Sequence, residues 1–409
     1  TYTSTIIEHL DSFRKFSKFE WYYLDFRKFN SSELNLNDFD GVIIHYSVRL
    51  PFDQLTEDSV LKLGKYSGVK GLFIQDEYDH TNKAKKIISD AGFNIVFTSV
   101  PESSINKIYP QSEFKNIRFI NNLTGYAPVG LSNIKSNFVP PSQRQLVISY
   151  RSRSLPLRYG QLGIDKIEIG RFVKNYCILN GISSDIAWTE ESRIYGDDWY
   201  NFLCSAKSML GTESGSNVFD WDGSLQHQIE QYKIQNPSAS DEQIYHKLVA
   251  SRELDGLMNQ VSPRIFEMIS ARTIMVLFEG AYSNILIPYK HYLPLRKDFG
   301  NIKEVFDYLN DANSIDNMAN IAYTDIIESE NYSYKSFVKL VDSKIEDSAL
   351  FQCVPIIRTN KGMVQSTIEV ERLPYRAKPK WWFLPAWIPS YLSEPLKGFM
   401  LASWKKIPR

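Results

Sequence analysis

The stretch Ser262–Asp298, SPRIFEMISARTIMVLFEGAYSNILIPYKHYLPLRKD, decides how the fold is interpreted. Ser262 and Pro263 stand where the N-cap and the first turn of a helix belong. The helix leads into an apolar run over Thr273–Phe278, which predicts a short buried strand. A second short strand opens at His291. Helix and strands in this succession favour an α/β domain with a parallel sheet.

The first turns of this helix carry two charged side chains on one face. Arg264 and Glu267 are three residues apart, while Phe266 and Ile269 mark the buried face. A helix N-terminus with an added guanidinium predicts a site for a phosphate or a diphosphate. Glu267, one turn further in, would accept hydrogen bonds from the paired hydroxyls of a ribose. The alternative is a surface pair in which Arg264 and Glu267 bind only each other.

The same segment resembles the C-terminal half of GT-B glycosyltransferases, and most of all the CgeB-like (spore maturation) branch of family-1-type enzymes. The resemblance rests on Arg-x-Phe-Glu in a helix, then a strand, a loop and a short His-Tyr strand. It covers the second half of the chain well and the first half in outline. It implies a nucleotide-sugar substrate, no bound metal or other cofactor, and substrate contacts from Arg264, Glu267, His291 and Tyr292. Related families often carry two glutamates eight positions apart here, but the earlier position holds Asn259.

Composition sets the broad class. A chain of 409 residues suits two domains rather than one core. Lys+Arg and Asp+Glu number 47 each, so charge does not indicate nucleic acid as the main partner. The three cysteines, Cys177, Cys204 and Cys353, are far apart and odd in number, which favours a reducing compartment. We therefore expect a cytoplasmic protein.

In the first half, apolar runs alternate with helical patterns. The fold class that we expect is α/β, GT-B, with two Rossmann-like doubly wound domains facing a cleft and a C-terminal tail that crosses back. The expected divisions are an acceptor domain (1–125), a linker (126–144), a donor domain (145–345) and a tail (346–409). The aromatic run Phe19–Phe26 predicts a strand. Since the chain opens on a helix, we expect a first strand and its glycine turn ahead of Thr3.

Acidic residues follow the predicted strand Val69–Ile74. Ligands of open parallel sheets bind at the carboxyl ends of the strands, so Asp76 and Glu77 are candidates for a general base toward an acceptor hydroxyl. His45, at the end of another predicted strand, is a weaker candidate of the same kind. The alternative is that Asp76 and Glu77 only cap the helix that follows.

Two further loops carry candidate donor contacts. The strand Gln145–Tyr150 delivers Arg151 and Arg153 at its carboxyl end, and either would meet the donor diphosphate unless both are surface arginines. The residues Tyr159–Gly163 predict a flexible loop, and a helix is expected from Asp165.

A later strand ends in Glu213-Ser214-Gly215. Small residues there let backbone N–H groups approach a ligand, with Glu213 as the candidate for direct donor or catalytic contact. Asp220 and Asp222 form an acidic pair that fits either a metal or, more simply, a turn.

The tail is rich in tryptophan and lysine. Trp381, Trp382, Trp387 and Trp404 alternate with basic residues, a composition typical of the membrane–water interface. Packing against the first domain is the alternative.

The resulting hypothesis is a glycosyltransferase that moves a sugar from a nucleotide donor to a hydroxyl of a bacterial surface polysaccharide or a lipid-linked glycan. Two rivals stay open at this point. One is a non-catalytic protein that binds nucleotides or carbohydrates, and the other is a nucleotide-sugar epimerase.

Overall fold

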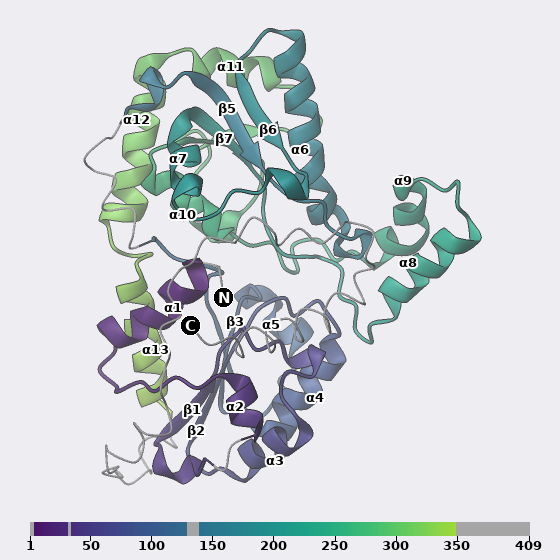
Figure 1. Cartoon of the computed structure of the whole chain (residues 1–409), viewed down its shortest axis with the longest axis vertical. Coiled ribbons are helices and arrows are strands. Elements are labelled where there is room, and N and C mark those ends of the chain that lie inside the picture. Colours follow the sequence, from purple (N-terminus) through teal and green to yellow (C-terminus); the bar gives the residue numbers. More distant parts are fainter. Residues whose placement is uncertain (1–3, 32–33, 129–138, 349–409) are drawn as a thin grey trace, which may run out of the picture. The chain divides into compact units, whose positions relative to one another are not determined.

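The structure is a computed structural model that describes residues 4–31, 34–128 and 139–348. Its strands form two parallel sheets, one of four strands and one of five. Helices connect the strands in each sheet (Figure 1). The expected α/β class with two parallel sheets is therefore confirmed.

The first sheet has its strands in chain order, β1-β2-β3-β4. They are β1 (Gly41–Ile44), β2 (Val69–Ile74), β3 (Ile95–Thr98) and β4 (Arg118–Asn121). The connecting helices are α3 (Glu57–Lys65), α4 (Thr81–Ala91) and α5 (Glu102–Ile108). Every residue of β2 and β3 is buried, as expected for central strands of a parallel sheet that is covered on both faces.

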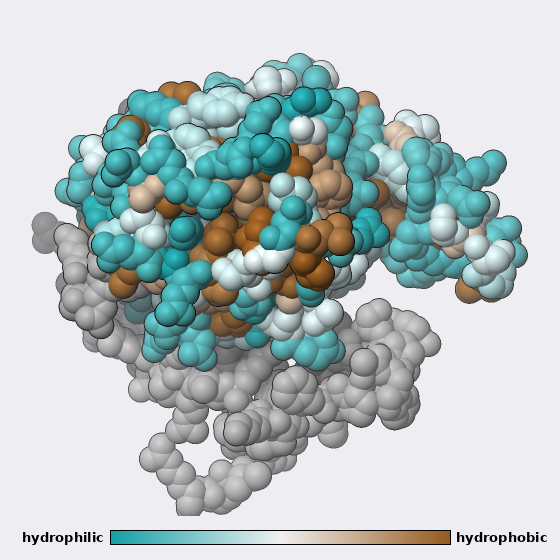
Figure 2. Space-filling model, turned by 90° about the horizontal axis from the view of Figure 1, so that it is seen from above, coloured by the Kyte–Doolittle hydropathy of each residue, from teal (hydrophilic) through white to brown (hydrophobic). Residues whose placement is uncertain are grey.

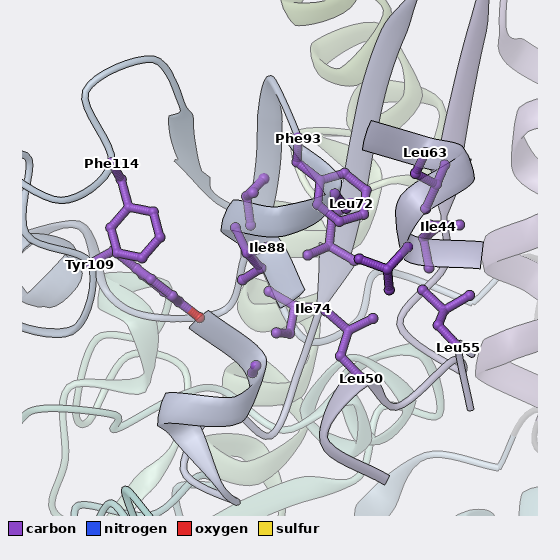
Figure 3. Packing of buried hydrophobic residues seen from close by; sticks show 14 of the residues in the cluster. Ile44, Leu50, Leu55, Leu63, Leu72, Ile74, Ile88, Phe93, Tyr109 and Phe114 are labelled. Atoms are coloured by element: carbon purple, nitrogen blue, oxygen red, sulfur yellow. The ribbon is translucent and has the colours of Figure 1, made fainter. Parts of the chain in front are cut away.

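Different helices cover the two faces of this sheet. On one face Leu63 of α3, Leu72 of β2 and Ile88 of α4 belong to one apolar cluster, which Figure 3 shows from close by. On the other face Phe73 of β2 and Phe97 of β3 belong to a second cluster, which the two helices α1 (Ser4–Phe16) and α13 (Tyr334–Glu346) cover; Phe73 packs there with Phe337.

The helix α13 brings a late part of the chain back to the first sheet. Asp342 accepts hydrogen bonds from the Ser17 hydroxyl at 2.7 Å and from the Lys18 N–H at 2.9 Å. Tyr334 donates to the carbonyl of Thr5 at 3.4 Å. The sequence predicted such a crossing for the tail 346–409, whereas the described return to the first sheet is made by α13, in the segment expected to belong to the donor domain.

The predicted strand Phe19–Phe26 is wrong. The described residues before α2 (Phe26–Ser31) belong to no strand, and the aromatic side chains pack on α1 instead. Trp21 lies 4.5 Å from Phe13 between ring centroids, and the Tyr23 hydroxyl donates to the carbonyl of Leu10 at 2.6 Å. Aromatic side chains fit any half-buried surface, and here packing against α1 outweighed the strand propensity of the run.

The second sheet has the order β6-β5-β7-β8-β9. Its strands are β5 (Leu146–Arg151), β6 (Ser184–Ala187), β7 (Ala206–Gly211), β8 (Ile274–Phe278) and β9 (Leu293–Leu295). The helices around it are α6 (Gly160–Leu179), α7 (Asp197–Ser205), α10 (Pro263–Ser270), α11 (Ile302–Leu309) and α12 (Ala312–Tyr323). β5 pairs with β6 on one side and with β7 on the other. The chain therefore leaves β5 and β7 in opposite directions along the sheet, which makes the gap between the loops after these two strands a topological switch point.

The loop that we predicted over Tyr159–Gly163 is wrong, because α6 already begins at Gly160. The carboxylate of Glu253 accepts a hydrogen bond from the Gln161 N–H in the first turn of this helix. Leu162 and Gly163 are buried there. An N-terminal partner from a distant segment therefore extends the helix over glycines that would favour a loop by themselves.

An insertion follows β7 and leads to α10. It contains α8 (Ser224–Gln235), α9 (Asp241–Ile244) and a π-helical turn over Tyr245–Val249, which share a small apolar cluster around Leu225 and Ile229. The surface of this segment is mainly hydrophilic on the face shown in Figure 2. The polar, helical pattern of Gln226–Leu254 predicts such an insertion, and the structure agrees with it.

Part of the linker, 129–138, and the tail from residue 349 lie outside the described residues. Membrane contact by the tail therefore stays a prediction. Among the helices that the structure describes, none is long and apolar enough to cross a membrane.

Candidate functional site

Arg264 stands at the start of α10, close to the carboxyl end of β5. Ser262 is the N-cap residue and Pro263 occupies the first turn, as predicted, although the Ser262 side chain makes no capping bond. The Arg264 guanidinium donates to the carbonyl of Arg151, the last residue of β5. It also lies over the ring of Trp199 on α7, 5.1 Å from the centroid. These contacts hold the cation at the edge where ligands of parallel sheets bind.

Glu267 lies one turn further along α10 and is held by the same tryptophan. The Trp199 Nε1 donates to Glu267 Oε2 at 2.8 Å. Burial raises the pKa of the Glu267 carboxyl, whereas the Trp199 bond and the Arg264 charge lower it. Trp199 was missed in the sequence, because only the fold brings α7 beside α10. The surface pair of Arg264 and Glu267 is thus replaced by a set of three side chains.

Lys166 on α6 adds a second cation that sequence reasoning missed. Burial lowers the pKa of its ammonium to about 8, helped by the charges of Arg264 and Arg153 and opposed by that of Asp76. Arg153 and Arg264 thus both lie near enough to Lys166 for their charges to act on its ammonium. Three cations that repel one another favour a bound anion of high charge, such as a diphosphate.

The two predicted arginines of the β5 loop have different surroundings. Arg151 forms a salt bridge with Asp185 at 2.8 Å and donates to the carbonyl of Ser192 at 3.0 Å, so its guanidinium is engaged within the protein. Arg153 is exposed and acts on Lys166 through its charge. Of the two, Arg153 is the better placed for a donor diphosphate.

The loop after β7 carries Glu213, Ser214 and Gly215. Glu213 is 7% exposed, and its two carboxylate oxygens accept hydrogen bonds from Tyr282 and Asn259. The Ser214 N–H donates to the carbonyl of Gln260 at 2.8 Å, so this amide is already engaged. Gly215 has φ +102°, and a Cβ there would lie 2.0 Å from the carbonyl oxygen of Met258. The glycine is thus required by the close backbone approach.

His291 and Tyr292 precede β9 and are both buried. The His291 Nδ1 accepts from the Ile287 N–H at 3.2 Å, and its Nε2 lies 3.0 Å from Asp325 Oδ2. Tyr292 is 1% exposed and packs edge-on against Tyr282 in an apolar cluster. These partners give both residues a structural role, and their contact with a substrate stays a prediction.

The two acidic candidates after β2, in the first sheet, differ in burial. Asp76 is exposed, has φ +59° and accepts a hydrogen bond from the Tyr78 hydroxyl at 2.6 Å. Glu77 is 2% exposed and accepts a hydrogen bond from the Thr98 hydroxyl at the end of β3. Burial raises the pKa of Glu77 to about 7. Both residues help to line a pocket together with Tyr46 and Arg49.

Asp79 was not singled out in the sequence, yet its carboxylate binds one basic residue near the first sheet and another near the second. It is 2% exposed and forms salt bridges with Arg49 at 2.8 Å and with Arg158, just before α6, at 3.0 Å. The Tyr159 hydroxyl donates to it at 3.3 Å. The sequence signal is limited to one acidic residue in an acidic stretch, because its two basic partners are 30 and 79 positions away.

The remaining candidates have structural partners. The carboxylate of Asp222 accepts from the Ser224 N–H at 3.0 Å, and that of Asp220 accepts from the Leu225 N–H at 3.1 Å, which agrees with a turn before α8. The His45 Nε2 lies 3.0 Å from His9 Nδ1, and burial lowers the pKa of His45 to about 4. Within the described ranges, no three potential ligand side chains gather as a metal site.

No protein-family model and no curated protein matches the chain. Solved structures do match, 36 chains in all. One is an α-glucosyltransferase in complex with UDP-glucose and DNA containing an abasic site. It has a TM-score of 0.48 and 10% identity over 79% of this chain and 84% of that chain.

Two further solved structures have lower TM-scores. A structure of TarM from S. aureus with UDP has a TM-score of 0.39 and 16% identity, over 69% of this chain and 51% of that chain. A DNA-modifying β-glucosyltransferase has a TM-score of 0.39 and 14% identity, over 81% and 87%. All three TM-scores lie below 0.5, so the function has to be argued from the side chains of the site.

Proposed function

We propose that the protein is a glycosyltransferase that uses a nucleotide-sugar donor and transfers the sugar to a hydroxyl. The observation that carries the proposal is the Arg264 guanidinium, held at the carboxyl end of β5 and over Trp199, with Glu267 fixed by the same tryptophan. The charges of Arg264 and Arg153 both act on Lys166 nearby. A nucleoside diphosphate needs both features, because its phosphates carry negative charge and its ribose offers a pair of hydroxyls.

The reaction follows from these positions. In group transfer from a nucleotide sugar, the diphosphate leaves with increasing negative charge, and fixed cations stabilise that charge more in the transition state than in the ground state. Arg153, Lys166 and Arg264 fill this role. Glu267, with Oε2 fixed by Trp199, accepts hydrogen bonds from the ribose through its other oxygen.

The acceptor side of the proposal rests on Asp76 and Glu77. A carboxylate near the acceptor hydroxyl removes its proton as the new bond forms. Asp76 is the exposed member of the pair, and its charge already acts on Lys166. The acceptor that we propose is a hydroxyl of a bacterial surface polysaccharide or a lipid-linked glycan, on the resemblance to CgeB-like enzymes.

Binding of nucleoside diphosphates to variants tests the donor site. Arg264→Ala and Lys166→Ala should each weaken binding about 10-fold to 150-fold, because a charge-assisted hydrogen bond contributes roughly 1.5–3 kcal/mol. Arg171→Ala is the matched control, since Arg171 is an exposed cation on the same helix as Lys166. Glu267→Ala should weaken UDP or GDP binding but spare inorganic diphosphate. Equal affinity of wild type and both cation variants for every diphosphate would remove the site.

Turnover is tested separately, by release of nucleotide from a panel of nucleotide sugars. Slow release without acceptor, accelerated by a glycan acceptor, is the expected result. Binding without any release would indicate the non-catalytic rival, and interconversion of two sugars without acceptor would indicate the epimerase. A DNA oligonucleotide serves as the contrasting acceptor, and stimulation by DNA alone would contradict the glycan part of the proposal.

A further inference from the structure

A short turn after β8 has an unfavourable backbone. Tyr282, Ser283 and Asn284 have φ values of 45°, 53° and 58°, three successive residues other than glycine in the left-handed region. This region is sterically costly for residues with a Cβ, so the surrounding structure must hold the turn. The turn lies beyond the carboxyl end of β8, on the edge of the sheet where parallel α/β folds bind ligands.

Specific hydrogen bonds hold this turn. The Tyr282 N–H donates to Glu213 Oε1 at 2.8 Å, and the Tyr282 hydroxyl donates to the carbonyl of Phe278 at 2.6 Å. The Ser283 hydroxyl oxygen accepts from the Val261 N–H at 3.0 Å. Val261 stands directly before the N-cap of α10, the helix that carries Arg264. The turn is therefore connected to the anion site through a single hydrogen bond and a few residues of chain.

Glu213 also belongs to a longer chain of hydrogen bonds. The Met258 N–H donates to Asn217 Oδ1 at 2.9 Å, and Asn217 Nδ2 donates to Asn259 Oδ1 at 2.7 Å. Asn259 Nδ2 then donates to Glu213 Oε2 at 2.5 Å. Glu213 and Asn217 are each 7% exposed, so these bonds face little competition from water. We call this chain, from Met258 through Asn217, Asn259 and Glu213 to Tyr282, the relay.

The relay needs one carboxylate, because the number of hydrogen-bond donors has to match the number of acceptors. Both of its ends are backbone N–H groups, of Met258 and Tyr282, and these only donate. An amide side chain accepts a hydrogen bond through its oxygen and donates one through its NH2 group, so the next side chain in the relay again meets a donor. Donors arriving from both ends must meet at a side chain with two acceptors, which is a carboxylate. Three amides would leave two donors facing each other.

We propose that Glu213 is a positioning residue, whose carboxylate closes the relay and so holds the left-handed turn and Arg264 in place. This inference rests on the proposed function for its effect on turnover. Glu213 has both oxygens engaged, and a Cβ on Gly280 would lie 2.7 Å from Oε2, so the carboxylate is packed against the backbone. Asn259, which stands where related families carry a glutamate, is its partner.

Charge relocation tests the proposal. Glu213→Gln alone leaves three amides between two donors and breaks one bond of the relay. The double variant Glu213→Gln/Asn259→Asp restores the count, because the new carboxylate accepts from Asn217 and from the new amide, whose oxygen accepts from Tyr282. Glu213→Gln/Asn217→Asp restores it in the same way, with the charge one side chain further away. Glu279→Gln is the control, since it removes an exposed carboxylate directly after β8.

Two measurements separate the outcomes. Hydrogen exchange of the Tyr282 amide should be about tenfold faster in Glu213→Gln, the equivalent of one lost hydrogen bond, and near wild type in both double variants. The KM for the nucleotide sugar should rise about tenfold in Glu213→Gln and recover in the double variants, because Arg264 is displaced and then restored. The Glu279→Gln control should match wild type in both measurements.

The results that overturn the proposal are equally distinct. Restored exchange without restored turnover would mean that the carboxylate of Glu213 itself touches the substrate. Exchange that stays fast in both double variants, or that never changes, would mean that the relay does not hold the turn. If wild type releases no nucleotide, the proposed function fails, and the exchange measurement still decides the role of Glu213.

Discussion

Glu77 shows how one buried carboxyl makes stability depend on pH. Burial raises its pKa from 4.5 to about 7, so between these values the native state keeps a proton that the unfolded state has lost. Stability from this group is therefore present below about pH 4.5 and is lost as the pH rises toward 7. The size of the loss is about 3 kcal/mol.

The variant Glu77→Gln keeps the acceptor for Thr98 and removes the titration. Urea unfolding at several pH values should show that the variant gains stability over wild type between pH 5 and pH 8, by up to about 3 kcal/mol. Glu242→Gln, at an exposed position on α9, is the control and should leave the curve unchanged. A difference between Glu77→Gln and wild type that is constant with pH would contradict the prediction.

At the scale of elements, Arg144 ties helix ends to the second sheet. It is 5% exposed, and its Nη1 donates to the carbonyl of Ala206 at 3.0 Å and to the Thr273 hydroxyl at 2.7 Å. Its Nη2 donates to the carbonyl of Ala271 at 2.7 Å. These groups lie where α7 passes into β7 and α10 into β8, so a single guanidinium satisfies acceptors at two helix C-termini.

Arg144→Met preserves much of the side-chain volume but leaves these buried acceptors without a partner. We expect a loss of about 3 kcal/mol or more in the free energy of unfolding, because each unpaired buried acceptor costs roughly 1–3 kcal/mol. Arg171→Met, on the outside of α6, should change it by less than about 0.5 kcal/mol. Urea unfolding measures both variants, and a loss below about 1 kcal/mol for Arg144→Met would show that water replaces the guanidinium.

The elements were also what the sequence predicted best. The apolar run Val69–Ile74 located β2 with its observed bounds, because a local pattern determines such a buried strand. The strand at Phe19–Phe26 failed where tertiary packing decided. For the candidate site, the sequence pattern indicated Arg264 and Glu267, whose role in binding stays a prediction. Lys166 and Trp199 were not, since their role depends on distances between segments far apart in sequence.

At the scale of the whole molecule, the tail beyond residue 348 carries a separate prediction. Deleting Pro379–Arg409 should reduce sedimentation with anionic lipid vesicles and leave transfer to a water-soluble acceptor largely intact. The lysines Lys397, Lys405 and Lys406 contribute about 1 kcal/mol each near anionic headgroups, so added salt should weaken binding of the full chain. Vesicle binding absent in both forms, with an earlier melting transition after deletion, would support packing against the first domain instead.

The return of α13 to the first sheet has a consequence for synthesis on the ribosome. The four strands of that sheet are complete at Asn121, yet the helix that covers Phe73 and Phe97 begins only at Tyr334, about 210 residues later. At roughly 5–20 residues per second, the nascent sheet waits about 10–40 s with that aromatic face incompletely covered. The first domain therefore cannot mature before the second has emerged. During that interval the chain offers chaperones an apolar surface that the finished protein hides.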